Sequence, residues 1–286
     1  MLRELASGVY VETEYEGGNV GLILTDHGAL LVDVPMLPTE ARQWQWRLTQ
    51  LGVKELYGLV NTDYHPEHVL GNGVFVPTRI IGHEFSTRPL ARYKPAVLEQ
   101  VSATYRDKDP QLAQEIMDLE IYGPELCVED RLTLYLGDRT IEILHLDGHT
   151  SASLGVYLPQ ERVLFAGDNL VNNEHPVMVH ANSLAWLDSL ARLQQMEIDL
   201  LVPGSGAVCG KEVIAPLEGY IRDMRERVTE QYQKGASRRE AVDKVGLLDY
   251  FPVPESQATR IKRRRRESIE RVYAEIRTQF PRAHHA

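Results

Sequence analysis

Cysteine is nearly absent from this chain of 286 residues, which contains only Cys127 and Cys209. Two thiols are too few for a disulfide framework and are typical of a reducing compartment. Long apolar runs are missing as well, because no stretch approaches the roughly 18 residues that a membrane-spanning helix requires. Residues 1–18 also lack the basic and then apolar layout of a signal peptide. We therefore expect a cytoplasmic protein that does not insert into membranes.

Positive charge is also scarce. The chain has 31 Lys and Arg residues against 41 Asp and Glu residues, which gives a formal net charge of -10. This balance is poorly suited to the phosphate backbone of a nucleic acid, so we expect no nucleic-acid partner. No internal repeats or low-complexity linkers interrupt the sequence, and its 43% hydrophobic content is enough to form a large buried core.

Short alternating or aliphatic runs predict β-strands over much of the chain before Lys211. The predicted strands are residues 8–15, 19–25, 29–34, 55–62, 79–83, 131–136, 140–146, 153–158, 162–168 and 198–204. The predicted helices are residues 38–51, about 84–119 and 183–196. From Lys211 onward the segments are charged and have helical spacing. The fold class is therefore α+β: a β-rich core over residues 1–210 with a helical insertion at about 84–119, and a helical C-terminal extension over residues 211–286 packed on the core.

Four consecutive arginines, Arg263–Arg266, lie within this C-terminal extension. Apolar residues recur around them at helical spacing: Ile261, Ile269, Val272 and Ile276. A basic patch for an acidic partner is one interpretation of the run. A solvated helix face is the favoured one, because the rest of the chain is acidic.

Residues 61–72, NTDYHPEHVLGN, hold an unusual concentration of side chains that can bind metal ions. Asp63, His65, Glu67 and His68 fall within six positions directly after a predicted strand. Such loops at strand ends collect functional side chains on a rigid scaffold. Two imidazoles beside two carboxylates in this setting indicate a metal site rather than ordinary polar residues of a helix N-terminus.

Three further segments follow predicted strands in the same way. His149 lies in Gly-His-Thr, Asp168 follows Gly167, and Ser205 stands between two glycines. Glycines beside these side chains allow the backbone to turn sharply. Each tripeptide alone is uninformative, but their order after the first cluster predicts one metal site built from several loops. His175 and His180 have no paired spacing, so we expect them on the surface or in the core.

This order of motifs resembles the metallo-β-lactamase superfamily. The resemblance runs from about Val20 to Gly206, and Asp33 stands at the acidic end of the matching opening strands. Part of the C-terminal extension is similar to the tail of some hydrolase-like members. The resemblance implies an αββα sandwich with a metal centre at one edge, followed here by the helical C-terminal extension.

The superfamily's ligand cluster is His-x-His-x-Asp-His, and the matching residues here are Asp63-Tyr64-His65-Pro66-Glu67-His68. By this resemblance one ion is held by four residues: Asp63, His65, His149 and Asp168. A second ion is held by Glu67 and His68 together with a shared Asp168. Ser205 stands where the superfamily has a histidine, and a neutral hydroxyl is a weak replacement. We therefore expect tight binding at no more than one position.

The substitutions also change the expected metal. Zinc is the ion that the resemblance implies, bound as one or two ions. This sequence supplies three carboxylates instead of two and has lost two imidazoles, which shifts the preference toward manganese or ferrous iron. The extra negative charge should also make a metal-bound water less acidic.

The leading functional hypothesis is a metal-dependent hydrolase with a small-molecule substrate. A metal-activated water attacks an ester, lactone, amide or phosphoester, and Asp63 or Glu67 orients or deprotonates that water. Tyr64 either donates a hydrogen bond at the site or packs under it.

Two alternatives stay open on the sequence alone. The first is a mononuclear iron oxygenase that acts on a thiol-derived substrate and holds iron with His65, His149 and Asp168. The second is a non-catalytic binding protein that has kept the fold. Apolar residues on the C-terminal helices can dock on the core or on another subunit, so a homo-oligomer is also open.

Overall fold

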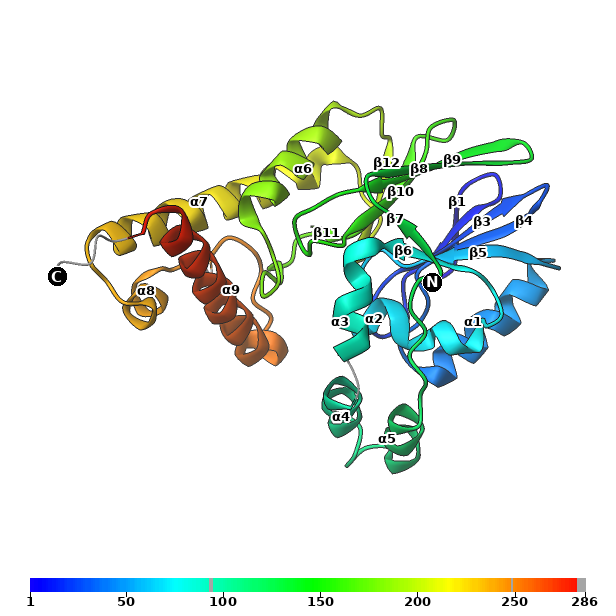
Figure 1. The fold of residues 1–286 in the computed structure, drawn as a ribbon, viewed down its shortest axis with the longest axis horizontal. Helices are drawn as coiled ribbons and strands as arrows, with labels where there is room; N and C mark the ends of the chain where they lie inside the picture. The colour runs from blue at the N-terminus through cyan, green and yellow to red at the C-terminus, as the bar shows by residue number, and fades with distance from the viewer. Residues whose placement is uncertain (93–94, 248, 282–286) are drawn as a thin grey trace.

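The computed structural model describes residues 1–92, 95–247 and 249–281. The remaining residues, 93–94, 248 and 282–286, fall within predicted helical segments and lie outside the described residues. Two β-sheets face each other across a buried apolar layer, and helices cover both outer faces (Figure 1). The helix–sheet–sheet–helix order confirms the predicted α+β sandwich.

The described residues form a seven-stranded and a five-stranded sheet. The strands of the first sheet follow chain order: β1 (Arg3–Ala6), β2 (Val9–Glu12), β3 (Val20–Thr25), β4 (Gly28–Val32), β5 (Leu56–Val60), β6 (Ile80–His83) and β7 (Leu126–Val128). The strands of the second sheet lie in the order β12 (Leu200–Ser205), β11 (Val163–Val171), β10 (Leu154–Leu158), β9 (Arg139–His145) and β8 (Arg131–Leu136).

The parallel strand pairs determine where functional loops can gather. Strands β4 to β7 are parallel to one another, and β12 is parallel to β11, whereas the other neighbours are antiparallel. The carboxyl ends of β4 and β5 therefore share one edge of the first sheet. Those of β11 and β12 share one edge of the second sheet.

Side-chain alternation along the strands creates two apolar faces on each sheet. In β4, Leu30 and Val32 face the second sheet, whereas Ala29 and Leu31 face the outer helix. In β11, Phe165 fills the layer between the sheets, and its ring packs so closely on Gly21 that a Cβ atom there would overlap it. Both faces of each sheet are thus covered, which explains why the strands read as nearly continuous apolar runs.

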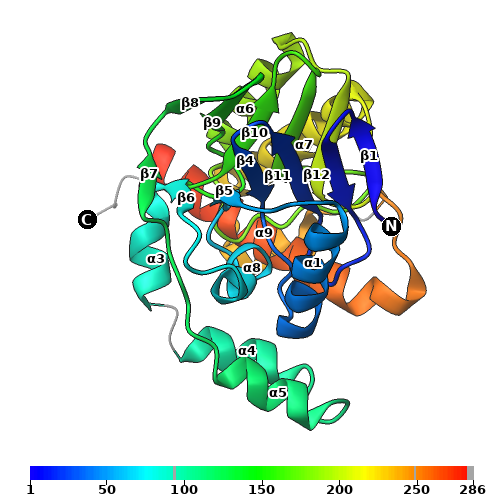
Figure 2. The same ribbon diagram turned by 90° about the vertical axis from the view of Figure 1, so that its right-hand side faces the viewer.

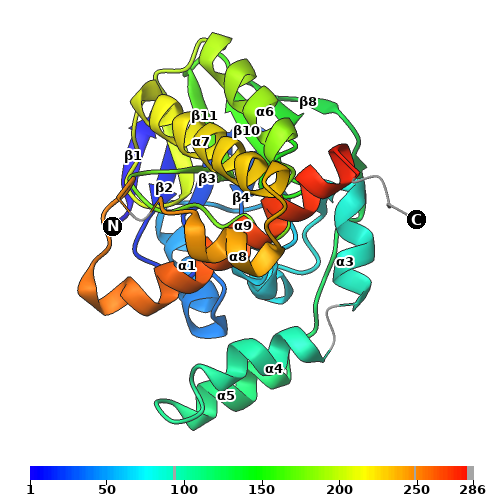
Figure 3. The same cartoon turned by 90° about the vertical axis from the view of Figure 1, so that its left-hand side faces the viewer.

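Helix α1 (Pro38–Gln50) covers the first sheet. Pro38 suits its first turn, and Trp44 and Leu48 are buried against the sheet. Helices α6 (Ser183–Gln195) and α7 (Ile214–Gln233) cover the second sheet, and the Asn182 side chain caps α6 by accepting the Ala185 N–H. Figure 2 looks at the side of α1, and Figure 3 looks at the opposite side, where α6 and α7 are in front.

The segment predicted as a helical insertion does contain helices. They are η2 (Glu84–Ser86), α3 (Thr87–Arg92), α4 (Ala96–Ala103) and α5 (Pro110–Met117). Helices α4 and α5 project from the sandwich (Figure 3). Leu98 and Ile116 join a small apolar cluster with Leu37 and Leu70, which fastens these helices to the core.

The helical C-terminal region packs on the second sheet. It consists of η3 (Lys211–Val213), α7, α8 (Arg238–Lys244), η4 (Glu255–Gln257) and α9 (Ala258–Gln279). A single apolar cluster runs from β9, β10 and β11 through α6 to α7 and α9. The boundary at residue 210 remains a prediction, because this shared cluster does not separate the two parts. No described helix has the length and apolar character needed to cross a lipid bilayer.

Two features differ from the sequence analysis. Strands β1 and β7 were not predicted, since they have only four and three residues and lie at the edges of the first sheet. Asp168 lies inside β11 rather than at its end, because the strand continues to Val171 through an irregular register.

Candidate metal centre

The candidate ligands lie where strands of both sheets end. Asp63 and His65 follow β5, and one carboxylate oxygen of Asp63 accepts the His65 N–H at 2.7 Å. His65 is the N-cap of the short helix α2 (Pro66–Val69), which carries Glu67 and His68. Pro66 fixes the first helical position, so the local sequence places these side chains on one turn.

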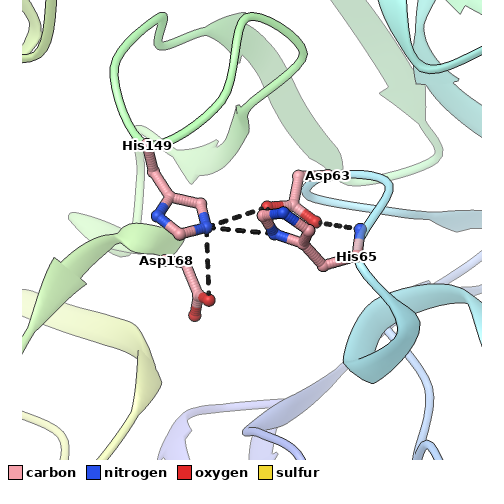
Figure 4. Close-up of side chains that lie close together, drawn as sticks. All are labelled: Asp63, His65, His149 and Asp168. Carbon is pink, nitrogen blue, oxygen red and sulfur yellow. Dashed lines mark hydrogen bonds and ion pairs between the residues drawn. The ribbon is translucent and has the colours of Figure 1, made fainter. Parts of the chain in front are cut away.

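Four of the predicted ligands converge on one point. The ligand atoms of Asp63, His65, His149 and Asp168 all lie within 4.8 Å of one another. Figure 4 shows His149 pointing across from the second sheet toward the other three. Its Nε2 atom lies 3.1 Å from His65 Nδ1, 3.5 Å from an Asp63 oxygen and 3.6 Å from an Asp168 oxygen.

A second group consists of Glu67, His68 and Asp168 and meets the same 4.8 Å limit. The Nε2 atom of His68 lies 3.7 Å from Asp168 and 3.8 Å from Asp63, too far for hydrogen bonds. This nitrogen is buried and has no hydrogen-bond partner among the described residues. A buried nitrogen left without a partner costs about 1–3 kcal/mol, so one that faces two carboxylates fits a bound divalent ion.

Hydrogen bonds behind the ligands turn the correct nitrogen atoms toward the centre. His68 Nδ1 lies 3.0 Å from Asp33 Oδ2, and His149 Nδ1 donates to the Val177 carbonyl at 3.0 Å. Asp33 itself accepts the N–H and the hydroxyl of Thr62 at 2.8 and 2.6 Å. Such partners fix the tautomer and leave the opposite Nε2 lone pair free for a metal.

Burial and the neighbouring charges strongly perturb the pKa values of these groups. Burial alone would lower the pKa of His65, but the Asp63 carboxylate raises it to about 9. The pKa of His68 is also raised, since Asp33 and Asp63 outweigh its burial. By contrast, burial lowers the pKa of His149 to about 4. Without a metal, the His65 imidazole therefore keeps a proton at neutral pH beside the Asp63 carboxylate.

Two glycines permit the close approach of the strands at this centre. Gly167 has a φ of +53°, and a Cβ atom there would lie 2.5 Å from the Thr62 hydroxyl. A Cβ atom at Gly204 would overlap the carboxylate of Asp168. Only glycine fits both positions without moving the ligand loops.

Ser205 and Tyr64 lie near the centre, and their roles as a weak ligand and a hydrogen-bond donor remain predictions. The Ser205 hydroxyl lies 3.5 Å from a carboxylate oxygen of Glu174 and lines the same pocket as Asp168. The ring of Tyr64 packs against that of His65, with 5.0 Å between their centroids. Burial raises the pKa of Tyr64 to about 12, so its hydroxyl keeps its proton at neutral pH.

The metal centre opens into a pocket of about 180 Å³. Glu67, His149 and Asp168 form part of its wall, and Arg260 and Arg264 of helix α9 form another part. A larger pocket of about 870 Å³ borders Tyr64 and His180 but contains none of the grouped ligand residues. The candidate ligands line the smaller pocket directly, so a molecule in it would lie against them.

Three residues near the centre gain a role that the sequence analysis did not assign. His180 is exposed, which is one of its expected placements, and its Nδ1 atom lies 2.8 Å from His65 Nε2. Arg264 is half-buried and lines the pocket, whereas Arg263 and Arg266 of the same run are exposed as expected for a solvated helix face. A signal existed in the sequence, since Arg264 follows buried Ile261 by three residues and precedes buried Ser268 by four. Glu174, which faces Ser205, was not identified at all.

The fold and the centre together define a metal-binding αββα sandwich. A family model described as the metallo-beta-lactamase superfamily matches residues 14–205, about two thirds of the chain. This chain belongs to the metallo-beta-lactamase superfamily. Its family and its His/Asp cluster support binding of a divalent metal ion.

Individual relatives are distant. A linear primary-alkylsulfatase from Pseudomonas sp. (strain ATCC 19151) is 22% identical over 264 residues, which cover 79% of this chain and 49% of the relative. A hydroxyacylglutathione hydrolase from Bartonella quintana is 32% identical over 80 residues, 28% of this chain and 30% of the relative. The chain therefore spans about half or less of these relatives.

A solved structure covers nearly the whole chain. The metallo-beta-lactamase family protein from Thermus thermophilus matches 96% of this chain and 95% of its own length. The TM-score is 0.70 at 19% sequence identity. This likeness includes the helical C-terminal region and shows a shared fold.

Proposed function

We propose that this protein is a metal-dependent hydrolase that cleaves an ester, lactone, amide or phosphoester bond in a small molecule. The observation that carries the proposal is the shared Asp168, which joins two ligand groups at the wall of one pocket. A substrate in that pocket would lie against the ligand residues. The hydrolase names of the distant relatives agree with this reaction class.

The two ligand groups should differ in affinity. The first offers four protein ligands, and the second offers three, of which Asp168 is shared. The Ser205 hydroxyl faces Glu174 and adds little to the second group. We propose one tightly bound ion at the first group and a weaker ion at the second. Zinc is proposed from the family, with manganese or ferrous iron as the alternatives that Asp63 favours through its oxygen donor.

When bound, the metal supplies a Lewis acid and a water molecule with a lowered pKa. The chain's own residues orient that water and move its proton. Glu67 lines the pocket, and burial raises the pKa of its carboxyl group, which makes it a stronger proton acceptor than an exposed glutamate. In ester cleavage, the acyl C–O bond breaks, the acid keeps the oxygen of the water, and the alcohol takes one of its protons.

Asp63 argues against the iron oxygenase alternative. A two-His, one-carboxylate iron site leaves several positions open, whereas Asp63 lies in the same group as His65, His149 and Asp168. A non-catalytic descendant is disfavoured by the buried His68 nitrogen, which has no hydrogen-bond partner among the described residues and faces two carboxylates, an arrangement that a bound ion would stabilise.

Metal analysis and turnover test the proposal together. The purified protein would be assayed for bound metal by mass spectrometry, then for hydrolysis of 4-nitrophenyl acetate with zinc or manganese added. We expect bound metal and turnover that a chelator abolishes. One iron per chain with oxygen uptake would support the oxygenase instead, and failure to bind any of these metals would support the non-catalytic alternative.

A further inference from the structure

Two arginines of helix α9 lie beside the metal centre. Arg260 and Arg264 are separated by one helical turn and line the same pocket as Glu67 and Asp168. The metal-ligand wall comes from the sandwich, and the arginine wall comes from the C-terminal helices. A molecule in the pocket would therefore meet the candidate ligands on one side and a guanidinium on the other.

These two arginines differ from their neighbours in their contacts. Arg263 lies 3.8 Å from Glu267, Arg266 lies 3.0 Å from Glu270, and Arg265 donates to the carbonyls of α8 and the following loop. Within the described part of the chain, the guanidinium groups of Arg260 and Arg264 make no hydrogen bond or ion pair. Their donors are thus free to bind a ligand.

The environment of Arg264 favours the binding of an oxyanion to its guanidinium group. Its side chain is half-buried, and burial together with the charge of Arg260 lowers its pKa. The carboxylates of Asp168, Glu174 and Glu67 raise the pKa but lie too far away for ion pairs. A guanidinium in this position stays charged, and an oxyanion that accepts two of its hydrogen bonds would replace the lost hydration.

The charge balance of the metal-loaded pocket also favours an anionic ligand. Five carboxylates line the pocket, belong to its ligand groups or contact a ligand imidazole: Asp33, Asp63, Glu67, Asp168 and Glu174. Arg260 and Arg264 offset two of these charges, and one divalent ion offsets two more. A second divalent ion would leave a positive excess. The metal ions and the two arginines therefore bring the pocket close to neutral, which permits a negatively charged substrate in an otherwise acidic protein.

We propose that the substrate is an anionic ester, whose oxyanion binds Arg264, assisted by Arg260, while its scissile bond lies against the metal ligands. This inference rests on the proposed hydrolase function and specifies its substrate class. The oxyanion, such as a carboxylate, is separate from the bond that is cleaved. Arg264 is then a specificity residue that selects the substrate.

A matched pair of substrates tests the proposal. Mono-4-nitrophenyl glutarate carries a carboxylate at the end of its acyl chain, whereas 4-nitrophenyl acetate has the same leaving group and no charge. In the zinc-loaded protein, Arg264→Ala should lower kcat/KM for the glutarate ester by about tenfold or more, since a charge-assisted hydrogen bond is lost. The value for the acetate ester should change by less than about threefold, because this ester has no carboxylate for Arg264 to bind.

Arg263→Ala is the matched control, because it removes the same charge from the adjacent exposed position. It should change neither substrate by more than about twofold, as is typical of a solvated surface charge. Metal content is measured for every variant. Equal losses for both esters in Arg264→Ala, or the same selective loss in Arg263→Ala, would overturn the proposal. If the alanine variant does not fold, Arg264→Gln also removes the guanidinium charge and is compared on the same two esters.

A binding measurement separates this inference from the hydrolase proposal. The ether 4-(4-nitrophenoxy)butanoate carries the same carboxylate but has no ester to cleave. By calorimetry it should bind the zinc-loaded protein at least about tenfold more tightly than it binds the Arg264→Ala variant. Its neutral amide should not distinguish the two proteins. If neither ester is hydrolysed, the proposed function fails, whereas equal binding of the ether by both proteins refutes the anion site.

Discussion

Asp33 is predicted to control the second metal position through His68. It is buried, and its carboxylate accepts both Thr62 donors and lies 3.0 Å from His68 Nδ1. Asp33→Asn keeps the shape of the side chain. It also tolerates the φ of +56° at this position, because asparagine is enriched in the left-handed region. The backbone should therefore stay in place while the charged acceptor is lost.

The size of the effect follows from these contacts. Loss of a supporting carboxylate typically weakens metal binding about 10- to 100-fold, or roughly 1.4–2.7 kcal/mol. The imidazole of His68 can then place its proton on Nε2, where a metal needs the lone pair. The metal-free protein should lose about 2 kcal/mol of unfolding free energy, since one hydrogen bond to a charged group is removed. Asp33→Ala should lose more, because it leaves both Thr62 donors without a partner and strains the backbone.

The measurement is a competition titration with a chromophoric chelator, combined with urea unfolding of the metal-free protein. Asp26→Asn is the control, since it removes a carboxylate from an exposed position just before β4, the strand that Asp33 follows. We expect Asp33→Asn to weaken the second ion and to leave the first within about threefold, because His68 belongs to the second group alone. Unchanged affinity for the second ion in Asp33→Asn would refute the orienting role of Asp33.

Three further outcomes are expected. His149→Ala should remove most bound metal and all turnover, because it deletes one of four ligands, and retention of both by mass spectrometry and assay would contradict the ligand set. Ser205→His should raise the metal-to-protein ratio toward two, provided that position 205 turns from Glu174 toward the centre; an unchanged ratio would show that another residue completes the second group. In the metal-free protein, the free energy of unfolding should fall as pH rises from about 6.5 to about 9. The folded state keeps a proton on His65 in this range that the unfolded state releases, and a flat or rising urea-unfolding profile would contradict the raised pKa.

The sequence by itself determined the features that depend on neighbouring residues. Strand alternation, the proline at the start of α1 and the helical spacing of α9 are local patterns, and they predicted the β-rich core and the helical C-terminal region, whereas the sandwich was implied by the family resemblance. The ligand cluster was also readable, because Asp63, His65, Glu67 and His68 fall within one loop and one helical turn. The order of the motifs then identified the family that the comparisons show.

Only the tertiary structure decided which distant side chains meet at the centre. His180 reaches His65 across a separation of 115 residues, and Arg264 approaches the pocket only because α9 folds back against the second-sheet side. Glu174 likewise becomes relevant because it faces Ser205 from another loop. Periodicity indicates which face of a helix is buried, but it does not specify the element that this face meets. That choice depends on the packing of the whole core, and here the packing brings an arginine to a metal centre.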